Sequence, residues 1–246
     1  MNLFETKKTK FISHRGFTPM APENSLPSFY YAGLFGQWAI ETDVHLTKDG
    51  EIVCCHNASL GKYCREDAVI AESTYAALCA LPIQNGARAE CFTDEERRIP
   101  KFSKYLDLCR RFESVPFIEL KTDDTERVIH ALKKHGFSEN EVVMSSTVFS
   151  RLRDTRLLAP GMFLHLIFAE EETLLKMASL GNAGVSLNIP DSFSCPPETV
   201  DAVHASGLKL CLRAADSLAA LANMRRLGLD YFPTNVLCER ETEENR

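Results

Sequence analysis

Eight short apolar runs alternate with amphipathic segments along almost the whole 246-residue chain. The apolar runs are typical of buried β-strands and cover residues 11–14, 39–44, 115–120, 141–146, 163–168, 183–188, 208–213 and 230–234. Segments with helical spacing lie between them, at residues 25–33, 101–111, 125–135, 147–158, 171–180, 197–205 and 217–227. Strands that alternate with helices form parallel sheets, and eight of them predict a closed (β/α)8 TIM barrel. An open doubly wound sheet is the alternative.

One stretch, residues 57–99, breaks this alternation. It contains a mixed polar run, a short apolar helix around residues 75–81 and the charged sequence DEERR before Pro100. It lacks the continuous apolar runs that barrel strands require. We therefore predict a single TIM-barrel domain over residues 1–246, in which residues 57–99 form a small inserted subdomain over the barrel mouth.

The overall composition limits the possible partners. The formal net charge of −6 argues against binding to nucleic acid or to an anionic membrane, so any anionic ligand must be bound locally. There is no apolar run of membrane-spanning length and no secretion signal, and the nine cysteines lack zinc-site spacing. We expect reduced, buried thiols, a cytoplasmic location, no membrane insertion and a small-molecule substrate, with no indication of oligomeric state.

The sequence IETDVHLTKDGEIVCCHN, residues 40–57, places two carboxylates at alternate positions of one expected strand. Glu41 and Asp43 would face the same side, because successive side chains of a strand alternate. The dipeptide Asp49-Gly50 predicts a two-residue type I′ hairpin turn. That turn pairs Asp43 with His56, so two anionic ligands and an imidazole are expected on one face.

Further polar residues fall at the C-terminal ends of expected strands, where (β/α)8 barrels carry their active sites. The first strand ends in HRG, which contains His14 and Arg15, and the strand at 115–120 leads into ELK, which contains Glu119 and Lys121. Arg15 and Lys121 suit a phosphate group, because arginine donates a fork of hydrogen bonds and lysine provides a point charge.

These residues together predict phosphodiester hydrolysis. Glu41, Asp43 and Glu119 offer an all-oxygen site that suits Mg²⁺ or Ca²⁺, with Mn²⁺ as a further possibility. His14 and His56 remain free to act as general base and general acid near neutral pH. A metal site, two cations and an acid/base pair are the groups that this reaction uses.

Several other polar residues are weaker candidates. We expect His45 to lie in solvent at the rim and His165 to be a hydrogen-bonded core histidine. Asn188, Arg213 and Asn235 end later strands, and binding and structural roles are equally compatible with their positions.

The motifs HRG, PENS (residues 22–25), ETDVHLTKDGEIVCCHN, IPKF and FIELK occur in this order along the chain. The combination resembles the glycerophosphodiester phosphodiesterase family over essentially the whole length. The resemblance implies a barrel with a subdomain inserted after the hairpin of the second strand. It implies a Mg²⁺ or Ca²⁺ ion on Glu41, Asp43 and Glu119, an acid/base pair at His14 and His56, and phosphate contacts from Arg15 and Lys121.

The same resemblance implies a reaction, the release of glycerol 3-phosphate and an alcohol from a glycerophosphodiester. In the family, a glycerol hydroxyl of the substrate is thought to attack its own phosphorus. One histidine accepts the hydroxyl proton while the other protonates the leaving alcohol, and water then opens the cyclic phosphate.

Three positions depart from the family pattern. Asn57 follows the second histidine where the family usually has aspartate, and Asn235 replaces the aspartate of a common Thr-Asp pair on the last strand. The sequence LCLRA at residues 210–214 replaces an aromatic-containing segment of the WTVN type. No metal ligand or acid/base residue is lost, so the departures concern the substrate pocket, where Arg213 would suit a more anionic substrate.

Three alternative functions remain on sequence grounds. A related barrel could act on lysophospholipid-type substrates, or a catalytically quiet barrel could bind a phosphate ligand. A sugar isomerase or aldolase-like barrel could also use the carboxylates on a metal, but it has no use for two free histidines beside Arg15 and Lys121.

Overall fold

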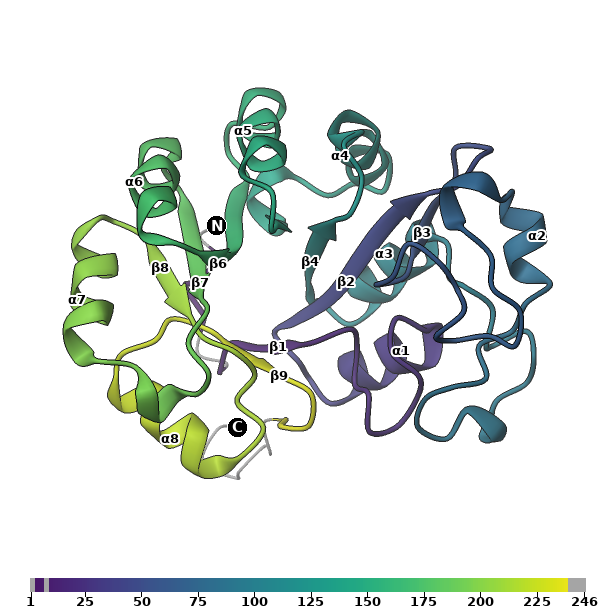
Figure 1. Cartoon of the computed structure of the whole chain (residues 1–246), viewed down its shortest axis with the longest axis horizontal. Helices are drawn as coiled ribbons and strands as arrows, with labels where there is room; N and C mark the ends of the chain where they lie inside the picture. Colours follow the sequence, from purple (N-terminus) through teal and green to yellow (C-terminus); the bar gives the residue numbers. More distant parts are fainter. Residues whose placement is uncertain (1–2, 7–8, 239–246) are drawn as a thin grey trace.

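The computed structural model describes residues 3–6 and 9–238, and in that part eight parallel strands follow one another around a barrel (Figure 1). Residues 1–2, 7–8 and 239–246 of the predicted domain lie outside the described residues. The order is β8-β7-β6-β5-β4-β2-β1-β9. The strands are β1 (Phe11–Ser13), β2 (Ala39–Leu46), β4 (Val115–Leu120), β5 (Val143–Ser146), β6 (Phe163–Ala169), β7 (Ala183–Leu187), β8 (Lys209–Cys211) and β9 (Phe232–Thr234).

The gap between the two end strands, β8 and β9, is bridged by backbone hydrogen bonds. The Ala215 N–H donates to the Pro233 carbonyl at 2.7 Å, and the Asp230 N–H donates to the Leu210 carbonyl at 3.0 Å. The sheet is therefore a nearly closed barrel, and the predicted (β/α)8 architecture is confirmed.

Helices alternate with the strands and surround the ring (Figure 1). They are α1 (Leu26–Leu34), α3 (Phe102–Arg111), α4 (Thr125–Lys134), α5 (Phe149–Leu158), α6 (Glu171–Leu180), α7 (Pro197–Ala205) and α8 (Leu218–Arg226). Helix α1 begins after Ser25, whose hydroxyl accepts the Ser28 N–H while the Ser28 hydroxyl accepts the Ser25 N–H. This reciprocal cap satisfies backbone donors that the first turn leaves free.

Alternate residues of each strand face two different cores. Phe11 and Ile118 belong to the apolar layer between strands and helices, whereas Ile12 and Phe117 belong to a smaller cluster in the barrel interior. Because strand side chains alternate, the residue two positions after an interior residue also faces the interior. This alternation thus determines which side chains at the strand ends point into the barrel mouth.

Tyr105 of α3 connects two barrel strands at their backbones. Its buried hydroxyl donates to the Ile40 carbonyl at 2.6 Å and accepts the Phe117 N–H at 3.1 Å. We expect Tyr105→Phe to lower the free energy of unfolding by about 1–3 kcal/mol, because two buried backbone groups lose this partner. Urea denaturation measures the change. Tyr30→Phe is the control, since the Tyr30 hydroxyl makes no hydrogen bond within the described residues, and an equal loss in both variants would contradict the assignment.

Residues 57–99 form a compact segment beside β2 and α1 (Figure 1). It contains the short helix α2 (Tyr75–Cys79), which confirms the predicted apolar helix, and two single-turn 3-10 helices. Together with Val53 and Cys55 of the hairpin it forms an apolar cluster separate from the barrel cores, to which the segment contributes Leu60, Tyr63, Cys64, Ile70, Leu78, Ile83 and Ile99. Its position over the barrel mouth stays a prediction.

The predicted hairpin turn is wrong by one residue. Strand β3 (Ile52–Cys54) pairs antiparallel with β2, with Leu46 opposite Ile52 and Val44 opposite Cys54. The loop therefore contains three residues, 48–50, and ends in Gly50 at φ +80°. A three-residue loop that ends in a left-handed glycine is another common hairpin type.

The shifted register changes how His56 reaches the site. Asp43 lies opposite Cys55, whose N–H donates to the Asp43 carbonyl at 3.0 Å, so Asp43 and His56 are not directly opposed. His56 follows the end of β3, where the chain has left the ladder. The expected pairing is thus wrong, and the imidazole enters the pocket from the segment after the strand.

The expectation of reduced, buried cysteine thiols agrees only partly with the structure. All nine cysteines are free, and six are buried, but Cys91 and Cys238 are exposed. Within the described residues, none of the helices has the length and apolar character needed to cross a lipid bilayer.

Candidate active site

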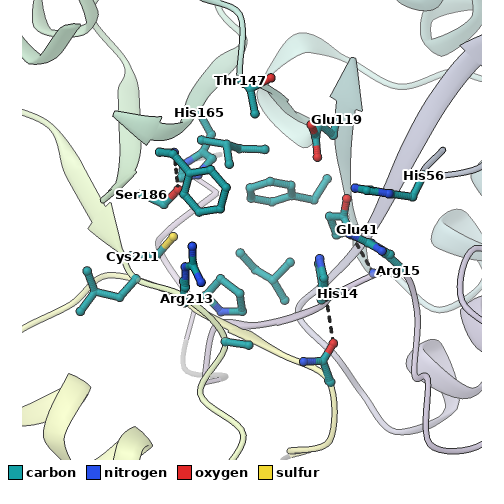
Figure 2. Close-up of a pocket in the computed structure, with 18 of the residues that line it drawn as sticks. His14, Arg15, Glu41, His56, Glu119, Thr147, His165, Ser186, Cys211 and Arg213 are labelled. Carbon is teal, nitrogen blue, oxygen red and sulfur yellow. Dashed lines mark hydrogen bonds between the residues drawn. The ribbon is translucent and has the colours of Figure 1, made fainter. Parts of the chain in front are cut away.

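A pocket of about 470 Å³ opens at the C-terminal ends of the barrel strands (Figure 2). Every predicted site residue lies in its lining except Asp43, which is fully buried. The predicted residues in the lining are His14, Arg15, Glu41, His56, Glu119 and Lys121. The opposite wall comes from the later strands and includes Phe168, Ser186, Arg213 and Asn235.

The strand period explains why these side chains point inward. His14 lies two residues after interior Ile12, and Glu119 lies two residues after interior Phe117. In β2 the interior residue is Ala39, so Glu41 is the next position on that face and Asp43 the one after. The strands β2 and β4 pair with Asp43 opposite Glu119, which brings these two carboxylates side by side, and Glu41 lies one position earlier on the same face of β2.

The three carboxylates form a compact acidic cluster. One oxygen from each of Glu41, Asp43 and Glu119 lies within 4.8 Å of the others, and all three residues are buried. The backbone N–H of Arg15 donates to Glu41 Oε2 at 2.7 Å, and the side-chain amide of Asn24 donates to Asp43 Oδ2 at 2.9 Å. The cluster is therefore rigidly held by backbone and side-chain donors.

Burial and mutual repulsion raise the pKa of two of the carboxylates. Burial, and next the charges of Asp43 and Glu119, raise the pKa of Glu41 well above its usual range. Burial and the Asp43 charge raise the pKa of Glu119 to about 7. Burial opposes ionisation of Asp43 as well, but the charges of Lys121, His56 and Arg15 together keep its pKa low. A divalent cation would favour ionisation of all three groups.

The cluster fits a hard divalent cation. Asp43 Oδ1 is buried and makes no hydrogen bond within the described residues, although Lys121 Nζ lies 3.2 Å away as an ion-pair partner. Carboxylate oxygens are the ligands that Mg²⁺ and Ca²⁺ prefer. Asp43 Oδ1, which has an ion-pair partner but no hydrogen bond in the described part of the chain, is therefore suited to bind a metal ion together with the other two carboxylates.

The two predicted phosphate-binding cations contact these carboxylates directly. Lys121 Nζ forms ion pairs with Asp43 and with Glu119. Arg15 Nη1 contacts Glu23 at 3.1 Å, and its Nε lies 3.6 Å from Asp43. Both cations line the pocket, so a bound anion would lie beside the acidic cluster.

Each predicted acid/base histidine is hydrogen-bonded through Nδ1 to an asparagine. His14 Nδ1 lies 3.0 Å from Asn235 Oδ1, and His56 Nδ1 lies 2.8 Å from Asn57 Oδ1. An amide oxygen can only accept, so each Nδ1 carries a proton and each Nε2 is free to accept one. These asparagines are the two positions that depart from the family pattern.

A carboxylate fixes the orientation of the Asn235 amide. The Asn235 Nδ2 group donates to Asp216 Oδ2 at 2.6 Å, so the amide oxygen must face His14. Burial, and next the charge of Arg15, lower the pKa of His14, which favours the neutral form of its ring. A neutral ring with a free Nε2 is the form that a general base needs.

The weaker candidates fall into three groups. His165 is buried with Nδ1 2.6 Å from the Tyr231 hydroxyl, and burial lowers its pKa to about 3, so the predicted core role is confirmed. His45 is half-buried, with Nε2 3.3 Å from the His56 carbonyl. Arg213 and Asn235 line the pocket, whereas Asn188 binds Arg213 from outside the lining.

Sequence reasoning missed three supporting residues. Asn24 holds Asp43, Glu23 holds Arg15, and Asp216 orients Asn235. The first two belong to the PENS motif, which served only for the resemblance. Asp216 gave no sequence signal, because its contact with Asn235 depends on how the segments after β8 and β9 lie side by side in the barrel.

The chain is similar to several known proteins. The family model described as "Glycerophosphoryl diester phosphodiesterase family" matches residues 14–236. A glycerophosphodiester phosphodiesterase of Caldanaerobacter subterraneus is 29% identical over 236 residues, which cover 93% of this chain and 94% of the relative. Another, of Bacillus altitudinis, is 27% identical over 247 residues, which cover 95% and 98%. The solved structure of an Oleispira antarctica phosphodiesterase with the product sn-glycerol-3-phosphate has a TM-score of 0.83 at 21% identity and covers 96% of both chains.

The barrel, its pocket of acidic, cationic and imidazole groups and these relatives define an enzyme of the phosphodiesterase class. The match over residues 14–236 is more specific: the chain belongs to the glycerophosphoryl diester phosphodiesterase family. The family inferred from the motifs is therefore confirmed.

Proposed function

We propose that this enzyme hydrolyses glycerophosphodiesters to glycerol 3-phosphate and an alcohol, with a divalent metal ion and two acid/base histidines. The observation that carries the proposal is the convergence of the acidic cluster with His14 and His56 in one pocket. The relatives in Caldanaerobacter and Bacillus, named glycerophosphodiester phosphodiesterases, support the substrate class.

Glu41, Asp43 and Glu119 would hold the ion, which we expect to be Mg²⁺ or Ca²⁺ (Mn²⁺ also suits the site). When bound, the ion supplies charge stabilisation to the phosphate oxygens. Arg15 and Lys121 orient the phosphate beside the cluster and neutralise the charge that its oxygens carry.

His14 and His56 move the protons. Both present an Nε2 that is free to accept a proton, because an asparagine oxygen occupies each Nδ1–H. One histidine takes the proton of the attacking glycerol hydroxyl, and the other, once protonated, gives a proton to the leaving alcohol. Their roles are exchanged when water opens the cyclic phosphate.

We propose that residues 57–99 are a small inserted subdomain that supports one rim of the mouth. Their separate apolar cluster supports this, as do the contacts of Lys62 Nζ (3.2 Å) and the Tyr63 hydroxyl (2.8 Å) with Glu23. Glu23 in turn holds Arg15. The free thiols fit a reducing compartment, and we propose a cytoplasmic location.

Lysophospholipids are the second candidate substrate class. The pocket has an apolar wall made of Phe117, Ile167, Phe168 and Leu212. Phe168 is 45% exposed, and an exposed aromatic ring at a pocket mouth could contact an acyl chain.

Hydrolysis of three substrates tests the proposal. We expect glycerol 3-phosphate from glycerophosphocholine and glycerophosphoethanolamine with added Mg²⁺ or Ca²⁺, and little product from lysophosphatidylcholine. A coupled glycerol 3-phosphate dehydrogenase assay and choline detection measure the products. Preferential cleavage of the lysophospholipid would favour the second candidate. Binding of glycerol 3-phosphate without turnover of any diester under Mg²⁺, Ca²⁺ or Mn²⁺ would indicate the catalytically quiet barrel.

A further inference from the structure

Arg213 lies on the wall of the pocket opposite the acidic cluster. Figure 2 shows it across the cavity from Glu41, Glu119 and His56. Its Nη2 donates to Asn188 Oδ1 at 2.8 Å, and its guanidinium lies 5.2 Å from the centre of the Phe168 ring. Within the described residues, no carboxylate lies within ion-pair distance of Arg213. Its exposed guanidinium therefore brings an uncompensated positive charge to the pocket.

An irregularity in β6 places the Phe168 ring beneath this guanidinium. The pairing of β6 with β7 shifts between Leu166 and Ala169, and Phe168 has φ +58°. A positive φ is costly for an aromatic residue, by about 1–3 kcal/mol, and such strain is maintained only where the surroundings determine it. The Phe168 N–H donates to Ser186 Oγ at 3.1 Å, which supplies a partner outside the ladder. The ring is thus held at the mouth as a platform for Arg213.

Arg213 differs from the other cations of the pocket in having no carboxylate beside it among the described residues. Arg15 and Lys121 contact Glu23, Asp43 and Glu119, so acidic side chains already balance them. In the part of the chain that the structure describes, Arg213 contacts only a neutral amide and a ring, which leaves most of its five N–H donors available to a ligand. Asn188 and Phe168 fix its position, so little side-chain entropy is lost when a ligand binds.

We infer that the pocket recognises a glycerophosphodiester that carries a second anionic group, a carboxylate or a phosphate, which Arg213 binds. The inference rests on the proposed function, in that the phosphodiester itself lies at the acidic cluster and Arg15. The second anion then lies on the far wall, where Arg213 forms a charge-assisted pair with it. This assigns Arg213, with Asn188 and Phe168 as positioning residues, to substrate selection.

Glycerophosphoserine and glycerophosphoethanolamine form a matched substrate pair, because they differ only by a carboxylate. We expect kcat/KM to be higher for the serine diester in the wild-type enzyme. In Arg213→Gln the ratio of the two kcat/KM values should fall about tenfold, the usual effect of one lost charge-assisted hydrogen bond. Arg153→Gln removes an exposed arginine of α5 that pairs with Asp154, and it should keep the wild-type ratio. An unchanged ratio in Arg213→Gln would overturn the inference.

A binding measurement separates this inference from the proposed function. Calorimetric titration with phosphoserine and phosphoethanolamine should show tighter binding of phosphoserine to the wild-type enzyme, by about tenfold. The preference should be lost in Arg213→Gln and partly kept in Arg213→Lys. If neither diester is hydrolysed but this preference holds, the proposed function fails, while the binding of a second anionic group by Arg213 stands. Equal binding of both compounds to the wild-type enzyme would refute the inference, whatever the hydrolytic activity.

Discussion

Replacement of His56 by alanine is expected to lower kcat by about 10²–10⁴-fold, and His14→Ala should have an effect of the same size. Both rings line the pocket, and each presents an Nε2 whose proton state is set by an asparagine at Nδ1. Without either ring, the attacking hydroxyl or the leaving alcohol must exchange its proton with water. Steady-state hydrolysis of glycerophosphoethanolamine at saturating Mg²⁺ measures the loss.

The control for the two histidine variants removes an imidazole outside the pocket. His130→Ala serves, because His130 is exposed on helix α4 and lies outside the pocket. We expect this variant to keep wild-type kcat. The His14 and His56 variants should keep wild-type metal affinity, since the three carboxylates remain. Full activity in either variant would remove that histidine from the acid/base pair, and loss of metal binding would assign it a ligand role instead.

The barrel was predictable because its signal is local. Each strand is a short apolar run, and the i, i+2 spacing that places Glu41 and Asp43 inside follows from strand geometry alone. The hairpin register was not predictable, because Asp49-Gly50 suits loops of two or three residues. Contacts of Asp49 Oδ1 with the Thr47 hydroxyl (2.6 Å) and the Tyr75 N–H (2.9 Å) accompany the three-residue loop. Tyr75 belongs to the inserted segment, so this contact depends on tertiary structure.

The convergence of the candidate residues in one pocket was also predictable, but their hydrogen-bond partners were not. Strand ends of a (β/α)8 barrel meet at one mouth, which is why His14 and Glu119 could be placed in one pocket. The pairing of His14 with Asn235 and of Asn235 with Asp216 joins the first strand to the last. Contacts between such distant segments have no periodic signal in the sequence. Both asparagines that depart from the family pattern hydrogen-bond a predicted histidine in the structure, Asn57 from the next position in the chain and Asn235 from just after the last strand.

Substitution of Glu119 by glutamine is expected to weaken the apparent Mg²⁺ affinity by at least about 100-fold and to abolish activity at low metal concentration. Glutamine keeps the shape of the side chain but removes one of the three carboxylates whose oxygens lie within 4.8 Å of one another. Mg²⁺ titration of activity after EDTA treatment and calorimetry of metal binding both measure the change. Glu126→Gln, on helix α4, is the matched control and should bind metal as the wild-type enzyme does.

The pH dependence of metal affinity distinguishes a ligand role from a structural role. The raised pKa of Glu119, about 7, means that below pH 7 a proton competes with the ion for this carboxylate. Wild-type affinity for Mg²⁺ should therefore rise between pH 6 and pH 8, and the rise should be shallower in Glu119→Gln, which has no proton to release at this position. A structural role would change stability in Glu119→Gln and leave this pH dependence as in the wild-type enzyme. Wild-type turnover that survives exhaustive chelation would exclude the metal from the reaction altogether.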